Sequence, residues 1–391
     1  MRTDSETVIL GYARTPMGGL LGSLRGLAAP RLGAAAIRAA LDRSGADGAC
    51  VDRVLMGCVL LGGLGQAPAR QAALAAGLPE AVPCTTVSKV CGSGMEALIL
   101  GHALLRAGLA RLVVAGGMES MSNAPHLLPD LRGGARLGHR GAVDSMFRDG
   151  LEDAYEPGRL MGSFGDGIAA EYGFTRAAQD AFALESLHRA RTAQAAHAFA
   201  RELVGVAVGG ASIERDEQPE TAKPEKIPTL RPAFSPDGTV TAANASSISD
   251  GAAALVLADA AAAQAAGLAP LARIVGTAGH AGPPARFACA PVPALRTLLE
   301  GIGWDVCDVD LFELNEAFAL VPMIAMRELG IPHERLNVHG GACALGHPLG
   351  ASGARIVATL LGALQVRGLK RGVAGLCIGG GEATAVAVEL M

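Results

Sequence analysis

Hydrophobic and polar positions alternate in the same order near both ends of this chain. An amphipathic, helix-like run precedes a short aliphatic, strand-like run at residues 54–56, and the same succession returns before residues 311–314. Three residue types accompany both runs at identical spacing. The matching positions are Arg38, Gly45 and Asp52 in the first copy and Arg296, Gly303 and Asp310 in the second, 258 residues later.

The correspondence continues further along the chain. In each copy a glycine-rich turn leads into a helical run and then a strand, and the strand ends in Gly-Gly-x-Glu. The turns begin at Gly92 and Gly350, the helical runs cover 97–107 and 354–363, the strands 112–115 and 373–376, and the motifs 116–119 and 379–382. This shared order predicts a duplicated unit of alternating strands and helices. We expect two βαβ-type layers whose sheets are largely parallel.

Between the copies, residues 121–245 are richer in charge and proline and predict an inserted lobe. The periodic segment 176–200 predicts a long, solvent-facing helix that covers the body. The aliphatic run 252–257 resembles the last strand of the chain, so we expect it to return to the first copy. The expected organisation is an N-terminal half of residues 1–120 and 246–268, a loop domain of residues 121–245 and a C-terminal half of residues 269–391.

Composition narrows the class of protein. Half of the 391 residues are hydrophobic, 53 are glycine and only 3% are aromatic, which predicts a core of small aliphatic side chains. The net charge of −4 provides no basic field for nucleic acid or a membrane surface. We see no uninterrupted apolar stretch of the roughly 18 residues that a membrane helix needs, and no secretion signal. These features predict a soluble cytoplasmic protein.

The eight cysteines include no Cys-x-x-Cys pair, so neither a zinc site nor a disulfide framework is predicted. Cys91 is a candidate nucleophile. It precedes Gly92-Ser93-Gly94 at the expected start of a helix, where unpaired backbone N–H groups and the helix dipole favour a thiolate. A buried, unreactive thiol fits the same position equally well.

Three more residues are candidates for chemistry. His347, before Pro348 in a second glycine-rich segment, can deprotonate a thiol or donate a hydrogen bond to an oxyanion, although a structural loop histidine also fits. Cys377 ends a strand where its repeat partner is Ala115, so only one copy has this thiol. Asn315 closes the strand at 311–314, either as the cap of a following helix or as a group that positions a water.

Two other features are less specific. The glycine-rich residues 62–65 are followed by neither a dinucleotide fingerprint nor a Walker lysine, so they do not predict a nucleotide loop. Four arginines of the insert form a modest basic patch, which fits either an anionic ligand or a solvated loop. They are Arg132, Arg136, Arg140 and Arg148.

Four motifs then occur in order over nearly the whole chain. They are Val90-Cys91-Gly92-Ser93-Gly94-Met95, Asn315-Glu316-Ala317-Phe318, Gly346-His347-Pro348-Leu349-Gly350 and Cys377-Ile378-Gly379-Gly380-Gly381. Together they resemble the thiolase family, the acetyl-CoA acetyltransferases and 3-ketoacyl-CoA thiolases. The resemblance implies a duplicated, five-layered αβαβα fold of the α/β class with an inserted loop domain, in agreement with the repeat and the insert.

The resemblance also implies a reversible, two-step acyl transfer, with coenzyme A or acyl-CoA as substrate and no tightly bound cofactor or metal. Cys91 takes the acyl group, His347 activates it, and Cys377 acts as acid and base on the second acetyl-CoA. His347 with a water on Asn315 stabilises one oxyanion, and the backbone N–H groups of Cys91 and Gly379 stabilise the other. A homodimer or homotetramer acting in fatty acid metabolism is implied as well.

The residues that the resemblance places against coenzyme A are one serine and six apolar residues. They are Ser246, Leu151, Met161, Phe234, Ala242, Ala317 and Phe318. Two departures bear on acyl specificity. Leu160-Met161-Gly162 stands where biosynthetic acetoacetyl-CoA thiolases carry His-Met-Gly, and Phe164 lies in what is otherwise a threonine-rich run. We expect Leu160 and Phe164 to shift preference away from acetoacetyl-CoA. The segment 214–228 also diverges, so no adenine-binding arginine is carried over.

Two other functions remain open. A ketoacyl-synthase-like condensing enzyme has the same fold with one cysteine and two histidines, but Asn315 and Cys377 stand where it would place the histidines. A non-catalytic acyl-CoA-binding relative is disfavoured because all four reactive positions are filled. The direction of the reaction and the acyl chain length stay open.

Overall fold

The computed structural model describes residues 6–391 and contains one continuous sheet built from two halves. Along its main path the strand order is β12-β13-β14-β11-β1-β10-β5-β3-β4, and β2 pairs with β10. The halves meet where β1 and β11 share only the pairs Val8↔Arg273 and Ile9↔Ala272. The strand bounds are β1 Thr7–Arg14, β2 Gly18–Gly19, β3 Arg53–Gly57, β4 Cys84–Val87, β5 Leu112–Ser120, β10 Ser249–Asp259, β11 Ala272–Ala281, β12 Leu311–Leu314, β13 Arg371–Ile378 and β14 Glu382–Leu390.

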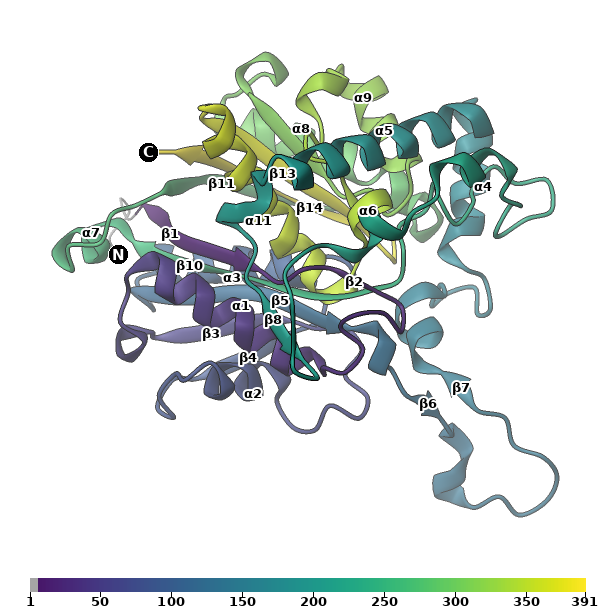
Figure 1. Cartoon of the computed structure of the whole chain (residues 1–391), viewed down its shortest axis with the longest axis horizontal. Helices are drawn as coiled ribbons and strands as arrows, with labels where there is room; N and C mark the ends of the chain where they lie inside the picture. Colours follow the sequence, from purple (N-terminus) through teal and green to yellow (C-terminus); the bar gives the residue numbers. More distant parts are fainter. Residues whose placement is uncertain (1–5) are drawn as a thin grey trace.

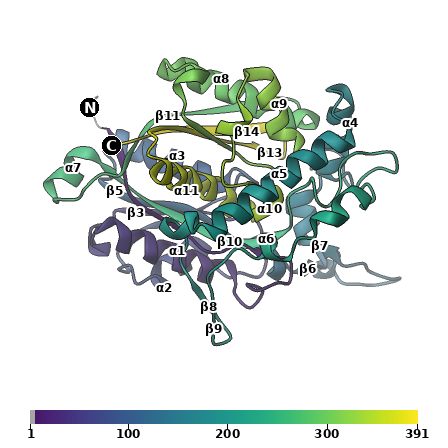
Figure 2. The ribbon, with the colours of Figure 1, turned by 45° about the horizontal axis from the view of Figure 1, so that its top comes forward.

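Helices fill three layers around the two half-sheets, as Figures 1 and 2 show. Helices α3 (Ser93–Arg106) and α11 (Leu349–Arg367) lie between the half-sheets and contact both. The outer face of the first half is covered by α1 (Ala29–Ser44) and α2 (Pro68–Ala75). The outer face of the second half is covered by α8 (Pro291–Ile302) and α9 (Leu320–Leu329). This confirms the duplicated αβαβα arrangement of the α/β class.

The repeated residues perform the same local task in both halves. Gly45 and Gly303 end α1 and α8 in the left-handed conformation, with φ of 66° and 70°, which a residue without a Cβ adopts without strain. The Asp52 carboxylate accepts hydrogen bonds from two backbone N–H groups at the start of β5, and the Asp310 carboxylate does the same at the start of β13. The spacing shared by the two copies therefore reflects residues that end a helix and bind the first N–H groups of a strand in each half.

The expectation of largely parallel sheets is wrong. Only β3–β4, β3–β5 and β12–β13 are parallel among the main pairs of the described chain, and the others are antiparallel. The reason lies in the returning strands. β14 follows β13 through the short turn Gly379–Gly381, which forces an antiparallel pair. The expected strand at 252–257 lies in β10, which returns from the insert and pairs antiparallel with β1 and β5.

The central helix α11 is closer in composition to a membrane helix than the sequence suggested. Among the described residues it alone is long and apolar enough to cross a membrane, with a mean hydropathy of 1.4. However, 89% of the apolar window is buried between the two half-sheets. A core helix of this kind passes the same test, so its apolar character is explained by its place in the middle layer.

The insert consists mainly of short elements, and its residues 126–144 extend from the body in Figure 1. They include β6 His126–Leu127, β7 Val143–Asp144, α4 Met161–Glu171, α5 Arg176–Ala195, β8 Val206–Val208, β9 Ala211–Ile213 and α6 Glu217–Thr221. The expected helix 176–200 ends at Ala195, and Phe199 lies in a separate 3-10 turn against His339. Helix α5 is also not simply solvent-facing, because one side packs on α10 (Ala342–Leu345). The domain boundaries themselves stay a prediction.

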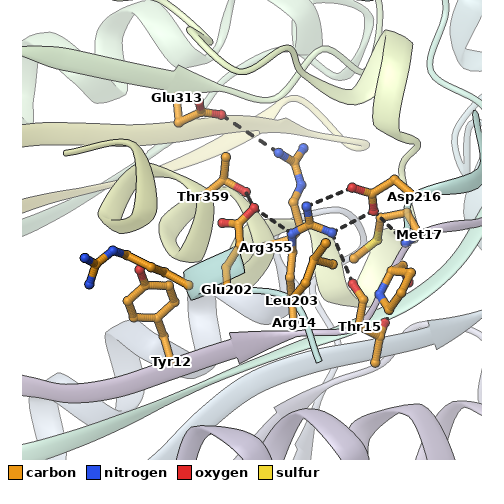
Figure 3. Close-up of polar contacts among 12 residues, drawn as sticks. Tyr12, Arg14, Thr15, Met17, Glu202, Leu203, Asp216, Glu313, Arg355 and Thr359 are labelled. Carbon is orange, nitrogen blue, oxygen red and sulfur yellow. Dashed lines mark hydrogen bonds and ion pairs between the residues drawn. The ribbon is translucent and has the colours of Figure 1, made fainter. Parts of the chain in front are cut away.

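A buried ionic cluster fastens the insert to the first half (Figure 3). Arg14, at the end of β1, contacts Glu202 through Nε at 2.9 Å and Asp216 through Nη1 at 2.7 Å, and all three side chains are at most 1% exposed. Breaking such a buried pair leaves an uncompensated charge, so the cluster fixes where the insert returns to the body. Asp216 also accepts the Met17 backbone N–H, which holds the segment after β1.

Candidate active site

The candidate nucleophile lies on a tight turn between β4 and α3. Val90, directly before Cys91, has φ of 45°, a conformation that strains a β-branched residue. The Ser93 hydroxyl stabilises the turn: it donates to the Val90 carbonyl at 2.7 Å and accepts the Lys89 N–H at 2.8 Å. The strained turn therefore fixes the position of the Cys91 side chain at the start of α3.

Burial outweighs the expected effect of the helix N-terminus on Cys91. Desolvation raises the pKa of the thiol to about 11, although the backbone N–H groups of Gly379 and of Cys91 itself, directed at the sulfur, lower it. The expectation of a resting thiolate is therefore wrong, because the surrounding protein disfavours the charge more than the N–H groups stabilise it. These two N–H groups nevertheless converge where a negative charge would develop.

His347 lies between α10 and α11 and is almost fully buried. Its Nδ1 is 2.5 Å from the Ser352 hydroxyl, which donates its single proton to the Pro348 carbonyl at 2.8 Å. The imidazole must then donate through Nδ1, which leaves Nε2 as a lone-pair acceptor. Nε2 has no hydrogen-bond partner among the described residues. Burial, with a smaller effect of Arg355, lowers the pKa of His347 to about 3, so the imidazole is a neutral base.

Asn315 lies behind His347. Its Nδ2 is 3.4 Å from His347 Nδ1, and its Oδ1 accepts from Arg355 Nη2 at 3.5 Å. The interpretation of Asn315 as a helix cap is wrong: α9 begins only at Leu320, and its N-cap is Ala319. The polypeptide between β12 and α9 instead holds the amide against the imidazole.

Cys377, near the end of β13, is 1% exposed, and burial together with the neighbouring Cys91 raises the pKa of its thiol well above the ordinary value. Two thiols and a neutral imidazole therefore occupy one region, and each carries no net charge at rest. All eight cysteines, which lie in the described part of the chain, are free.

A cavity of about 650 Å³ brings the predicted residues together. It is lined by Cys91, His347, Cys377 and Gly379 and by all seven predicted coenzyme A contacts, Ser246, Leu151, Met161, Phe234, Ala242, Ala317 and Phe318. Among the predicted catalytic and coenzyme A-binding residues, only Asn315 does not line it. A larger hollow of about 880 Å³, between residues 45–50, 105–112 and 258–268, contains none of these groups.

Several residues of the site were not predicted from the sequence. Phe287 forms an edge-to-face contact with Phe318 at 5.9 Å between ring centroids, but nothing in its local pattern signals a site. Glu217 lies in the divergent segment 214–228, and its carboxylate accepts the Gly19 and Ser23 N–H groups at 3.0 and 2.9 Å. Ser352 contacts His347 without lining the cavity, and it could have been found because it stands one helical turn after the His-Pro turn.

Leu160 and Phe164, the two departures from the family pattern, have different positions relative to the cavity. Leu160 lines the cavity, whereas Phe164 does not: it is 3% exposed, and the Arg159 guanidinium stacks over its ring at 3.7 Å. The expectation that Phe164 shifts acyl preference is therefore not supported by its position. The four arginines of the insert, Arg132, Arg136, Arg140 and Arg148, are exposed and do not line the cavity either. Residues 62–65 form a surface turn.

Comparison with known proteins covers the whole chain. Residues 7–261 match the thiolase N-terminal domain and residues 268–390 the thiolase C-terminal domain. Acetyl-CoA acetyltransferase 1 of Arabidopsis thaliana is 49% identical over 99% of this chain and 94% of its own length. An acetyl-CoA acetyltransferase of Pseudomonas aeruginosa is 47% identical over 97% of this chain and 98% of its own length.

Solved structures show the same relationship. A thiolase from Ascaris suum in complex with coenzyme A superimposes with a TM-score of 0.95 at 42% identity and covers 99% of this chain and 100% of its own. The acetyl-CoA acetyltransferase of Bacillus anthracis gives a TM-score of 0.97 at 36% identity and covers 100% of both chains. The matched domains, the relatives and the duplicated fold agree, and the chain therefore belongs to the thiolase family.

Proposed function

We propose that this chain is an acyltransferase that condenses two acetyl-CoA molecules, or cleaves a short 3-ketoacyl-CoA with coenzyme A, through an acyl-enzyme on Cys91. The observation that carries the proposal is the convergence of Cys91, His347, Cys377 and the Gly379 N–H on one cavity. The relatives named as acetyl-CoA acetyltransferases and the coenzyme A complex of the Ascaris suum thiolase support the substrate.

In the first half-reaction His347 Nε2 accepts the Cys91 proton as the sulfur attacks the thioester carbonyl. A neutral pair suits this step, because the high pKa of the thiol and the low pKa of the imidazole keep the proton on sulfur until the substrate arrives. The tetrahedral intermediate collapses with loss of coenzyme A, which takes the proton back from His347. His347 with a water on Asn315 stabilises one oxyanion of the cycle in this proposal.

In the second half-reaction Cys377 gives its proton to His347, which is neutral again, and the thiolate so formed removes an α-proton from a second acetyl-CoA. The resulting carbanion attacks the acyl group on Cys91, the carbon–carbon bond forms, and the Cys91 sulfur leaves and takes the proton held on His347. The N–H groups of Cys91 and Gly379, which are directed at the Cys91 sulfur, are placed to stabilise the oxyanion that forms on the acyl-enzyme. Thiolysis runs through the same steps in reverse.

The proposal is tested by finding the acyl group. After brief mixing with acetyl-CoA and acid quenching, peptide mass spectrometry should find one acetyl group on Cys91, and free coenzyme A should be released in equal amount. A Cys50→Ser variant, which changes an exposed thiol outside the cavity, serves as the control and should be acetylated to the same extent. No acetyl group on Cys91 under turnover would contradict the proposal.

Leu160 is proposed to set acyl preference. Leu160→His should raise kcat/KM for acetoacetyl-CoA relative to a longer 3-ketoacyl-CoA by roughly tenfold, because a polar contact returns to the cavity wall while apolar surface is lost. Phe164→Leu is the matched control, since this side chain is buried outside the cavity. It should lower thermal stability and leave the substrate ratio unchanged. An unchanged ratio in Leu160→His would exclude this role.

Cytoplasmic placement, a role in fatty acid metabolism and a homodimer or homotetramer stay proposals. The relatives supply the family but not these properties, and size-exclusion chromatography with light scattering tests the assembly directly.

A further inference from the structure

The two Gly-Gly-x-Glu motifs of the repeat each extend a glutamate into the other half of the molecule. Glu119, of the first copy, accepts the Gly350 N–H of the second copy at 2.8 Å. Glu382, of the second copy, contacts Lys89 of the first at 2.6 Å between Oε2 and Nζ. Gly350 opens the turn that corresponds to the one at Gly92, three residues after Lys89. Each glutamate therefore holds the glycine turn of the opposite copy.

The two contacts differ in character. Glu119 is completely buried and also accepts the Val59 and Leu60 N–H groups, so it has a packing role. Glu382 and Lys89 remain 39% and 29% exposed, and in the described structure they form a single ion pair. An exposed ion pair contributes little to global stability. Its location, rather than its contribution to folding, then needs an explanation.

The Lys89–Glu382 pair joins the two turns that carry the reacting groups. Lys89 stands two residues before Cys91, and Glu382 three residues after Gly379. The turns touch closely: a Cβ on Gly92 would lie 2.4 Å from Ile378 Cδ1, and one on Gly379 would lie 3.6 Å from Val90 Cγ1. The second turn is intrinsically soft, since Gly380 and Gly381 have φ of 93° and 86°. An ion pair between the two turns limits the conformational freedom of the glycine turn.

We propose that Lys89 and Glu382 form a positioning pair that fixes the Gly379 N–H relative to the Cys91 sulfur. The inference rests on the proposed acyl transfer. Neither side chain lines the cavity, so neither contacts the substrate directly. Loosening the pair lets the Gly379 turn move away from the sulfur and weakens stabilisation of the oxyanion. Binding of acetyl-CoA is preserved, so the effect falls on the chemical step.

The test is a set of charge variants measured for kcat and KM in condensation. Lys89→Met and Glu382→Gln should each lower kcat roughly tenfold, with KM changed by less than about twofold. The double variant should lose no more than either single one, because both remove the same contact. Lys89→Arg keeps the charge and should retain kcat within about threefold. Should Lys89→Met fail to fold, Glu382→Gln and Lys89→Arg carry the comparison.

Arg273→Met is the matched control. Arg273 on β11 contacts Glu389 of the same strand β14 at 2.6 Å and Glu6 at 2.8 Å, so it forms half-exposed ion pairs away from the cavity. Its loss should leave kcat unchanged. Unchanged kcat in Lys89→Met, or an equal loss in Arg273→Met, would overturn the inference. Acetylation of wild-type Cys91 is measured in parallel, because its absence would instead reject the proposed function.

Discussion

Cys377→Ala should separate the two half-reactions. Acetylation of Cys91 by acetyl-CoA should stay within about threefold of wild type, while formation of acetoacetyl-CoA should fall by roughly a thousandfold or more. The reason is that the Cys377 thiol lies in the cavity beside Cys91 but has no part in the first proton transfer, which His347 performs. Both thiols are uncharged at rest, so the substitution leaves no charge behind near the nucleophile.

The two steps are measured separately. Rapid-quench mass spectrometry follows the acetyl-enzyme, and an absorbance assay follows acetoacetyl-CoA. Cys343→Ala is the control: this thiol is half-buried, 3.7 Å from the Glu316 carbonyl, and it does not line the cavity. It should preserve both steps. Equal loss of acetylation and condensation in Cys377→Ala would show that Cys377 supports the site instead of acting as the base.

Duplication could be predicted from the sequence because the repeated residues satisfy local backbone groups. Gly45 and Gly303 end helices, and Asp52 and Asp310 bind the N–H groups at the start of the next strand. Such tasks depend on a few neighbouring residues, so they leave a fixed spacing. Strand direction was mispredicted because it depends on the route of the connection, which hydrophobic patterns do not report.

The candidate site was likewise only partly predictable from the sequence. Motifs located Cys91, His347 and Cys377, since each lies at a recognisable turn or strand end. The charge state of Cys91 was mispredicted, because desolvation depends on residues from distant segments, such as Met161 and Cys377, that enclose the same cavity. The contacts of Glu119 and Glu382 with the opposite copy could not be predicted from the sequence either. Their motifs repeat, but which half each one contacts depends on how the copies face each other.

Replacing His347 with glutamine should lower the rate of Cys91 acetylation at pH 7 by roughly a thousandfold and change its pH dependence. In the wild type, the pKa of His347 is about 3 and that of Cys91 about 11. The neutral pair is therefore the dominant form between these values, and the rate should be flat from pH 5 to 9. An ordinary histidine would instead give a loss of rate below its usual pKa of about 6.5.

The variant has no base in the cavity, so it reacts only through the thiolate that solvent hydroxide generates. Its rate should rise about tenfold per pH unit toward the thiol pKa, whereas the wild type shows no slope. Single-turnover release of coenzyme A from pH 5 to 9 measures both profiles, and circular dichroism at each pH confirms folding. Folding must be checked at the acid end, because an unfolded chain binds a proton on histidine below pH 6.5 that buried His347 refuses down to about pH 3. A wild-type inflection near pH 6.5, or parallel profiles for the two proteins, would show that His347 is not the base that the geometry indicates.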